Sequence, residues 1–519
     1  MSEGIIRYKN ATKCVLDTGD YGLAMTMGDT YSFYAPGYQF TPKFKQKRWD
    51  GRIRLFSLVD CSFPTGLLPR IVSDFPNLEL DEYVKSVFRE PNSSREQLNA
   101  FYEKMRFYSN CKEITPREDQ KEALYRAIQM KRCTNVCPTS FGKSLCIFME
   151  CLWHIAHNRR CVIIVPTIDL VEQFYNDITD YCTMEDGSLS PLYPNMWKIS
   201  AKYGKDIPQD TNITITTWQS AMSITKNMDQ RWMDRNFDVY IQDEVHICGS
   251  GKELQNIANS ATTIEYRTGW TGSLKNGSVN ALLVEGCFGP TKEITTLVNL
   301  MDQGSIAKLK INLTFLTYPE DIKEQVMGLD YPSEIKYIEN SSKRTNMIAK
   351  MTSVFKGNSV ILINHIAHGQ KIYDKLRSVY PDKPVYFVHG SHYERCGKLY
   401  KGIEDLKPII EKEDNAIIVA NLAVFSTGIS LKSLKYIVFG VPFKSYIKTI
   451  QSIGRGLRVR EDKDKCRLID LIDDFSIKKK KNTKGGDSYK RSFAYKHFIQ
   501  RYEYYNQAGL ESDFHRINL

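Results

Sequence analysis

The sequence predicts an α/β fold with two tandem parallel-sheet domains, a small α+β domain before them, and a short, basic, mostly helical region after them. Short, continuously apolar runs such as Cys161–Val165 and Ser359–Ile363 recur between stretches of helical spacing. Buried strands that alternate with helices are typical of parallel sheets covered on both faces. Since the pattern occurs in two successive blocks, we expect two such domains with a cleft between them.

We divide the chain into four segments, because 519 residues suffice for three or four domains with cores of their own. The first segment is aromatic, basic and rich in turn residues, and is predicted to bind nucleic acid. The next two are the α/β blocks, and the last begins near the lysine run Lys478–Lys481. The predicted boundaries are 1–112, 113–308, 309–475 and 476–519.

Composition narrows the functional class. Hydrophobic residues make up 42% of the chain, which excludes a disordered protein. The formal charge of +11, from 71 basic and 60 acidic residues, permits a polyanionic partner without identifying one. The 13 cysteines lack the spacing of a disulfide framework, so a reducing intracellular compartment fits best. Neither a leader nor an apolar run near the roughly 20 residues that span a bilayer is visible, so we expect a soluble protein without a membrane partner.

A phosphate-binding loop is predicted at residues 137–144, between a short strand and a helix. Lys143 would neutralise the β- and γ-phosphates of ATP, and the Ser144 hydroxyl would bind Mg²⁺. Cys137 replaces the first glycine of the usual pattern, which would strain the loop if that position needed a positive φ. The alternative is an ordinary Gly–Lys helix start. The residues expected to contact the nucleotide are Pro138, Thr139, Ser140, Phe141, Gly142, Lys143 and Ser144.

An acidic motif, Asp243-Glu244-Val245-His246, follows an apolar strand. This places the carboxylates at the carboxyl edge of a sheet, where α/β folds bind ligands. We expect Asp243 to hold Mg²⁺, Glu244 to act as general base for the attacking water, and His246 to sense the γ-phosphate. A surface acidic turn is the alternative.

A pair of arginines is predicted to complete the catalytic site from the second α/β block. Gln451, Arg455 and Arg458 stand in a Q-x-x-G-R-x-x-R pattern, and the arginines three apart share one helix face. Their planar donors suit a transferring phosphoryl group, so hydrolysis would depend on domain closure. The alternative is a basic helix face.

Taken together, these motifs resemble superfamily 2 helicases of the DExH type over residues 113–475. The resemblance implies two RecA-like domains and a nucleic-acid-dependent ATPase. Arg117 and Gln120 resemble the adenine-reading Q motif, and Gly428 belongs to motif V and would contact the nucleotide. The segments at Thr167 and at Thr217-Trp218 resemble motifs Ia and Ib, which touch the nucleic-acid backbone in the family. Thr271-Gly272-Ser273 resembles motif III, which couples hydrolysis to movement.

The first segment is similar to the N-terminal domain of the recombination helicases of T-even phages, through Phe33–Phe40 and Arg48–Leu55. This similarity implies an ATP-driven DNA motor for forks, Holliday-type junctions and R-loops. It also implies work in recombination, repair and replication within the cytoplasm of a bacterial host. We expect a monomer, with phage recombination or single-strand-binding proteins as partners.

Basic and aromatic residues alternate between residues 38 and 56. Basic side chains bind phosphates and aromatic rings stack on unpaired bases. For most of these aromatics, the core of a small β-rich domain is an equally good explanation. The residues predicted to bind nucleic acid here are Lys43, Lys45, Arg48, Trp49 and Arg52.

Three other functions stay open at this stage. An RNA helicase is not excluded by the residues themselves. A restriction-system motor would need a nuclease, for which Pro319-Glu-Asp and Glu334-Ile-Lys336 are a poor match. A non-catalytic DNA-binding or annealing protein is disfavoured, because Lys143, Asp243, Glu244 and Arg458 are intact.

Overall fold

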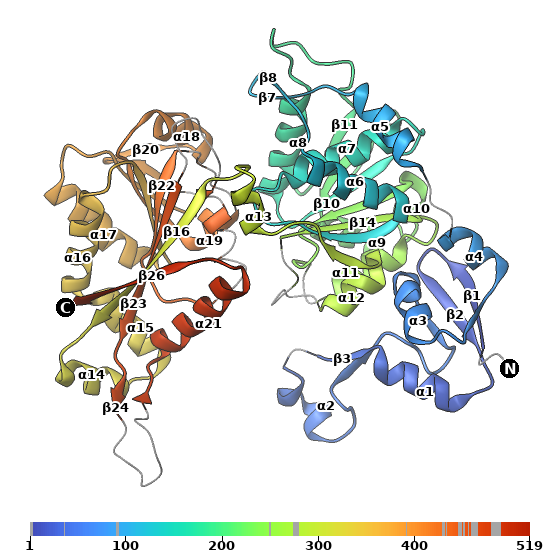
Figure 1. Cartoon of the computed structure of the whole chain (residues 1–519), viewed down its shortest axis with the longest axis horizontal. Coiled ribbons are helices and arrows are strands. Elements are labelled where there is room, and N and C mark those ends of the chain that lie inside the picture. The colour runs from blue at the N-terminus through green and yellow to red at the C-terminus, as the bar shows by residue number, and fades with distance from the viewer. Residues whose placement is uncertain are drawn as a thin grey trace. The chain divides into compact units, whose positions relative to one another are not determined.

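A computed structural model of the chain forms two compact units, Met1–Thr295 and Thr296–Leu519, and each is described by itself (Figure 1). The division into four segments stays a prediction. Within the described part, no helix is both long and apolar enough to cross a membrane. The structure describes residues 4–35, 37–89, 93–248, 251–272, 274, 280–390, 392–427, 431, 433–444, 449, 452–454, 456–457, 465–478 and 489–519.

The first unit begins with a small sheet of order β5-β2-β1-β6, in which β1 pairs antiparallel with β2 and parallel with β6. A separate hairpin, β3–β4, carries the short helix α2 between its strands. The strands of this N-terminal part are β1 Ile5–Asn10, β2 Lys13–Asp17, β3 Ser32–Tyr34, β4 Arg52–Arg54, β5 Ser62–Pro64 and β6 Glu79–Leu80. Its helices are α1 Tyr21–Thr30, α2 Pro42–Lys45, α3 Leu68–Asp74 and α4 Glu82–Arg89, with 3₁₀ turns at Tyr38–Phe40 and Thr65–Leu67.

A seven-stranded, all-parallel sheet of order β11-β12-β10-β13-β14-β9-β15 forms the rest of the first unit. Its strands are β9 Arg132–Val136, β10 Cys161–Val165, β11 Met196–Ile199, β12 Ile213–Thr217, β13 Val239–Asp243, β14 Tyr266–Thr271 and β15 Thr291–Glu293. The helices are α5 Arg95–Glu103, α6 Glu118–Met130, α7 Lys143–Ile155, α8 Ile168–Cys182, α9 Trp218–Asn227, α10 Trp232–Asn236, α11 Lys252–Ser260 and α12 Ala281–Phe288. A small hairpin pairs β7 Phe107–Ser109 with β8 Lys112–Ile114.

The second unit is built on a nine-stranded sheet of order β20-β19-β18-β21-β17-β22-β23-β16-β26, in which β19 pairs antiparallel with both β18 and β20 and all other neighbouring strands pair in parallel. Its strands are β16 Lys308–Thr317, β17 Asn358–Ile363, β18 Val385–His389, β19 His392–Arg395, β20 Lys398–Tyr400, β21 Ile417–Asn421, β22 Leu434–Phe439, β23 Lys465–Asp474 and β26 Ser512–Asn518. A short pair, β24 Ile477–Lys478 and β25 Tyr489–Lys490, precedes the last helix. The helices are α13 Leu297–Asp302, α14 Glu320–Met327, α15 Tyr331–Asn340, α16 Ser342–Ser353, α17 Ile366–Val379, α18 Ile403–Lys412, α19 Leu422–Thr427 and α21 Phe493–Gln507.

These sheets confirm the α/β fold class with two parallel-sheet domains and a small N-terminal domain. The expected strands occur within one or two residues of their predicted positions, as at Cys161–Val165. Strand β26 was not foreseen. It returns from the C-terminal region to pair along β16, so this region continues the second sheet as well as supplying helix α21.

The small N-terminal domain packs directly on the first parallel-sheet domain. Their apolar side chains form one continuous buried cluster. The Ala11 N–H donates to the Thr262 carbonyl at 2.9 Å, and the Arg70 guanidinium pairs with the Glu285 carboxylate at 2.7 Å. At Gly66 the two parts are so close that a Cβ would lie 2.2 Å from the Glu285 carbonyl oxygen. The sequence, by contrast, gave no indication of a shared core.

We therefore predict that Gly66→Ala destabilises the first unit, because the added methyl group meets backbone that cannot move aside. Overpacking of this kind costs roughly 1–3 kcal/mol. Urea unfolding followed by fluorescence would measure the loss. Gly19→Ala is the matched control, since nothing lies within 4 Å of its Cβ position. Equal stability of the two variants would contradict the tight contact at Gly66.

Candidate nucleotide-binding site

The predicted catalytic motifs of the first unit meet at one edge of its sheet. Strands β13, β14 and β9 are neighbours, with Asp243 beside Trp270 and Thr271 beside Val136 in register. Since the strands are parallel, the segments that follow them emerge together at their carboxyl ends. The phosphate loop, the Asp-Glu pair and the Thr271-Gly272 segment are therefore adjacent.

The phosphate loop leads directly into helix α7. Gly142 is the N-cap of α7 with φ 89°, and Ser140 also has a positive φ of 71°. Cys137 does not belong to the residues with positive φ, so the strain that glycine replacement could have caused is absent. Its N–H donates to the Thr271 carbonyl at 2.8 Å, and its side chain is fully buried. The N-terminal N–H groups of α7 then face the position where an anion binds.

Two side chains before the first strand hold the phosphate loop in place. The Arg117 guanidinium and the Gln120 amide both donate to the Phe141 carbonyl, at 2.7 and 2.8 Å. The φ of 89° at Gly142 favours glycine, and a Cβ there would also displace the Gln120 amide, whose Nε2 atom lies 2.5 Å from the Cβ position. The sequence predicted that Arg117 and Gln120 read adenine. The structure gives them a loop-holding role, and the adenine contact stays a prediction.

Lys143 and Glu244 form an ion pair across the site, with 3.1 Å between Nζ and Oε1. Both side chains are largely buried. Burial disfavours the charge on Lys143, but the carboxylates of Glu244 and Asp243 outweigh it and raise the pKa of Lys143. Burial likewise opposes charge on Glu244, yet Lys143 and His246 lower the pKa of Glu244. The Gly272 N–H donates to Glu244 Oε2 at 3.3 Å. Glu244 also has a left-handed φ of 47°, so its backbone is strained at the site.

Asp243 offers an oxygen that fits a metal ion. The residue is buried, and within the described part of the chain its Oδ1 atom has no hydrogen-bond partner. Burial, followed by repulsion from Glu244, raises the pKa of Asp243 to about 7. The Ser144 hydroxyl shares a hydrogen bond of 2.8 Å with the Tyr181 hydroxyl on α8. A carboxylate and a hydroxyl oxygen are ligands that Mg²⁺ prefers, so Ser144 and Asp243 suit that ion.

His246 connects Glu244 to strand β14. Its Nδ1 atom shares a 2.5 Å hydrogen bond with the Thr271 hydroxyl and lies 3.3 Å from Glu244 Oε2. Burial lowers the pKa of His246, so the neutral ring is favoured. A change at Glu244 can therefore reach Thr271 through one side chain, which is the geometry a γ-phosphate sensor needs.

The residues of the predicted motifs Ia and Ib lie at the same sheet edge. Thr167 is the N-cap of α8 and Thr217 is the N-cap of α9, and each hydroxyl accepts a backbone N–H three residues on. Thr217 pairs in register with Val165, so the two caps emerge from neighbouring strands. Trp218 begins α9 and is half-buried. Two helix N-termini side by side suit phosphate contact.

The predicted basic and aromatic segment divides into exposed and structural residues. Lys43 and Lys45 on α2, and Arg48 after it, are exposed. Trp49 is half-buried, and its indole N–H donates to the Arg52 carbonyl at 2.8 Å. The Arg52 guanidinium lies 5.0 Å from the centre of the Tyr34 ring. Figure 1 shows α2 and β3 set apart from the strands β1 and β2.

The aromatic rings of this segment divide in the same way. Phe40 is 78% exposed, whereas Phe56 is 1% exposed and belongs to the core. The core interpretation therefore holds for Phe56, and base stacking remains open for Phe40.

Four predicted site residues lie outside the described part of the structure: Gln451, Arg455, Arg458 and Gly428. Their roles stay predictions. Conversely, sequence reasoning missed Tyr181, which lies 37 residues after Ser144 in the chain. No local pattern marks a tyrosine near the end of a helix as the partner of a hydroxyl in a distant loop.

Comparisons with known proteins agree with the fold. The family model of the DNA helicase UvsW N-terminal domain matches residues 6–84, and that of the type III restriction enzyme res subunit matches residues 113–272. The ATP-dependent DNA helicase uvsW of Enterobacteria phage T4 is 31% identical over 496 residues, which cover 95% of each chain.

Solved structures are similar over the whole chain. The crystal structure of T4 UvsW is 28% identical, with a TM-score of 0.51 and coverage of 99% of both chains. A fragment of a putative HsdR subunit of a type I restriction enzyme from Vibrio vulnificus has a TM-score of 0.51 over 100% of this chain and 92% of its own. It is 15% identical, so it supports the fold alone.

Burial of Cys137 leads to a prediction about thiol reactivity. Burial raises the pKa of the Cys137 thiol well above its usual range, so the reactive thiolate is scarce at neutral pH. We expect iodoacetamide to spare Cys137 in the folded protein and to modify Cys111, which is exposed. Peptide mass spectrometry would measure both sites. Equal modification of the two thiols before unfolding would show that the loop is open to solvent.

Proposed function

The chain belongs to the family of ATP-dependent DNA helicases that includes UvsW of phage T4, and from this premise we propose that it is a motor that remodels branched DNA. The substrates we propose are forks, Holliday-type junctions and R-loops, in recombination, repair and replication. The observation that supports ATP hydrolysis most directly is the meeting of Lys143, Asp243 and Glu244 at one sheet edge.

The Lys143–Glu244 ion pair indicates how nucleotide binding starts the reaction. The phosphates of ATP bind at the N-terminus of α7 and attract the Lys143 ammonium away from Glu244. Glu244 is then released to orient and deprotonate the attacking water. Ser144 and Asp243 would hold Mg²⁺, which neutralises phosphate charge when bound.

The second unit supplies the remaining catalytic groups in this proposal. Arg455 and Arg458 stabilise the charge on the transferring phosphoryl group, and Gln451 supports them. An arginine in this role increases kcat by a factor of roughly 10³–10⁵. The nucleotide would therefore be hydrolysed only when both units contribute, which couples each turnover to a movement along DNA.

We propose two kinds of DNA contact in the first unit. The helix caps Thr167 and Thr217 bind the backbone of one strand, together with Trp218. The segment with Lys43, Lys45, Arg48 and the exposed Phe40 meets unpaired bases at a junction. Because the N-terminal domain shares a core with the parallel sheet, a force at one contact is transmitted rigidly to the other. We further propose that the protein acts as a monomer beside phage recombination or single-strand-binding proteins.

A restriction-system motor is the second candidate, because the res-subunit model matches residues 113–272. The nuclease-like residues argue against it. The buried Glu334 carboxylate accepts the N–H groups of Phe493 and Ala494 at 3.0 and 2.7 Å. Pro319 is the N-cap residue of α14. Glu334 and Pro319 therefore have structural roles at the N-termini of helices α21 and α14.

The central test is an ATPase assay with single-stranded DNA, duplex, a four-way junction, an R-loop and duplex RNA at one salt concentration. We predict the strongest stimulation by the junction and the R-loop. Lys143→Ala should retain DNA binding but lose turnover by roughly 100-fold, as expected when a main source of electrostatic stabilisation is removed. Stimulation by RNA alone would favour an RNA helicase, and unchanged turnover in Lys143→Ala would reject the catalytic site.

A second prediction concerns base stacking by Phe40. Phe40→Ala should leave the unfolding free energy unchanged, because the ring is exposed, and weaken binding of single-stranded DNA by about 1–3 kcal/mol. Fluorescence anisotropy with an oligonucleotide measures the affinity. Val59→Ala, at an equally exposed apolar residue of the same domain, is the control. If both variants bind like the parent protein, Phe40 is not a stacking platform.

A further inference from the structure

Helix α21 of the C-terminal region is held to the second sheet by a fully buried arginine. The Arg501 guanidinium donates to both oxygens of the Asp470 carboxylate on β23, at 2.9 and 2.8 Å. Its third nitrogen donates to the Phe443 carbonyl at 2.5 Å. Neither side chain of the ion pair is exposed at all. The Tyr505 hydroxyl, one helical turn further on, donates to Asp470 at 2.9 Å.

A second buried arginine, Arg344, makes a related contact three residues further along β23. Arg344 on α16 donates to the Asp473 carboxylate at 2.9 Å and to the Gly440 carbonyl at 2.7 Å. The Tyr318 hydroxyl donates to the same carboxylate at 2.6 Å. Here, too, the ion pair is fully buried. Each guanidinium therefore joins an aspartate of β23 to a carbonyl of the segment that follows β22.

The two carbonyls lie just beyond the end of β22, where the Gly440 N–H still donates to the Leu362 carbonyl of β17 at 3.0 Å. Strand β22 ends at Phe439, and the chain then runs toward the Q-x-x-G-R-x-x-R motif. The described residues of that motif are firmly packed. Ile453 and Leu457 are fully buried, and a Cβ at Gly456 would lie 2.4 Å from Cδ1 of Ile437. The Leu457 carbonyl accepts the Ala307 N–H at 2.8 Å.

We propose that Arg501 and Arg344 are positioning residues for ATP hydrolysis, which fix the backbone at Phe443 and Gly440, from which the chain continues to Arg455 and Arg458. The inference rests on the proposed role of those two arginines. It also gives helix α21 a function that the basic charge of the C-terminal region did not suggest. The helix serves as a fixed anchor for the catalytic motif rather than as a loose tail.

Physical chemistry favours a geometric role for these ion pairs over a purely stabilising one. Apolar residues of similar volume often give equal or greater stability than a buried ion pair, because burying charge is costly. A guanidinium, however, has five donors in a rigid plane, so one side chain fixes the direction of a carboxylate and of a carbonyl together. Apolar packing cannot fix the direction of a carbonyl.

The test separates hydrolysis from folding and from nucleotide binding. Arg501→Lys keeps the charge but cannot reproduce the planar fork, and Arg501→Met with Asp470→Leu replaces the pair by apolar groups. We expect kcat of the DNA-stimulated ATPase to fall by about tenfold or more, a part of what an arginine finger supplies. KM for ATP should stay within about threefold, because Lys143 and the phosphate loop are untouched. Rates are expressed per nucleotide site, titrated with a fluorescent ATP analogue, so that unfolded protein does not count.

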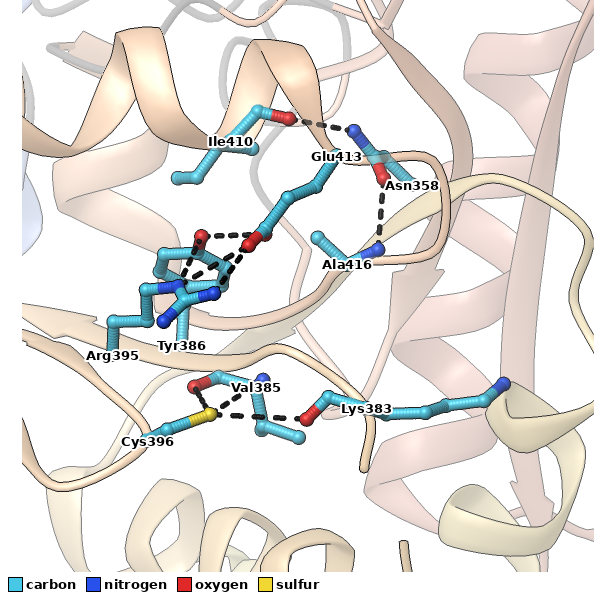
Figure 2. Close-up of polar contacts among 9 residues, drawn as sticks. All are labelled: Asn358, Lys383, Val385, Tyr386, Arg395, Cys396, Ile410, Glu413 and Ala416. Atoms are coloured by element: carbon cyan, nitrogen blue, oxygen red, sulfur yellow. Dashed lines mark hydrogen bonds and ion pairs between the residues drawn. The ribbon is translucent and has the colours of Figure 1, made fainter. Parts of the chain in front are cut away.

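The control is a partly exposed ion pair with the same combination of arginine, carboxylate and tyrosine at the opposite part of the same sheet (Figure 2). Arg395 pairs with Glu413 at 2.7 Å, and the Tyr386 hydroxyl donates to the same carboxylate at 2.5 Å. The hydrogen bonds and ion pair of Arg395 join it to Tyr386 and Glu413, and none of them reaches a described residue of the 440–457 segment. Arg395→Met with Glu413→Leu should therefore keep kcat per site within about twofold of the parent.

Each outcome has a distinct meaning. A tenfold loss of kcat per site in Arg501→Lys, with the control unaffected, supports the proposal. Unchanged kcat per site in Arg501→Lys overturns it, whether or not the double variant folds. An equal loss in the control would also overturn it, because the effect would then be general. The variant Arg458→Ala separates failure of the proposed function from failure of this inference. If Arg458→Ala retains ATP turnover, the proposed catalytic role of the arginine fails. If Arg458→Ala loses turnover but Arg501→Lys does not, only the positioning role of Arg501 is rejected.

Discussion

The buried ion pair of Lys143 and Glu244 is the interaction on which the nucleotide site depends. A single ammonium faces the carboxylates of Glu244 and Asp243 in a buried place, and burial together with Glu244 raises the pKa of Asp243 to about 7, which opposes an excess of negative charge. Such an excess is costly unless a cation joins it. Mg²⁺ with ATP would answer this need, because the metal would pair with the aspartate and the phosphates would compete for the lysine. The residues of the site therefore suit the joint binding of metal and nucleotide.

Departure from the usual loop sequence at Cys137 is tolerated for a local geometric reason. The loop concentrates its left-handed backbone at Ser140 and Gly142, and the first position needs only a small side chain that can be buried. The left-handed backbone at Gly142, more than its close contact with Gln120, then explains the need for glycine at the second position. The positions of the loop motif therefore differ in how strictly the backbone conformation requires one residue type.

Sequence reasoning located the parallel strands and the catalytic edge because both are local patterns. A buried parallel strand such as Cys161–Val165 is apolar throughout, and Asp243-Glu244 follows another at once. Strand β26 escaped, because an edge strand with mostly exposed residues has no such signature and forms only beside β16. Three other features were not predicted from the sequence either: the shared core of the N-terminal domain, the Tyr181–Ser144 hydrogen bond and the contacts of Arg117. Each joins residues far apart in sequence, and a sequence without its fold does not show which of them meet.

Arginines that donate to irregular backbone recur in this chain. Arg117 donates to the Phe141 carbonyl in the phosphate loop, and Arg126 donates to the Pro290 carbonyl before β15. Arg132 reaches the Ala11 carbonyl of the N-terminal domain. A carbonyl outside helices and sheets lacks a regular donor, and leaving it unpaired in the interior costs free energy. Guanidinium groups meet that demand from a distance and fix direction as well as position. In a protein whose work is repeated movement, the segments next to the chemistry must return to one geometry after each cycle. Charge-assisted hydrogen bonds to backbone suit this better than apolar contact, which permits sliding.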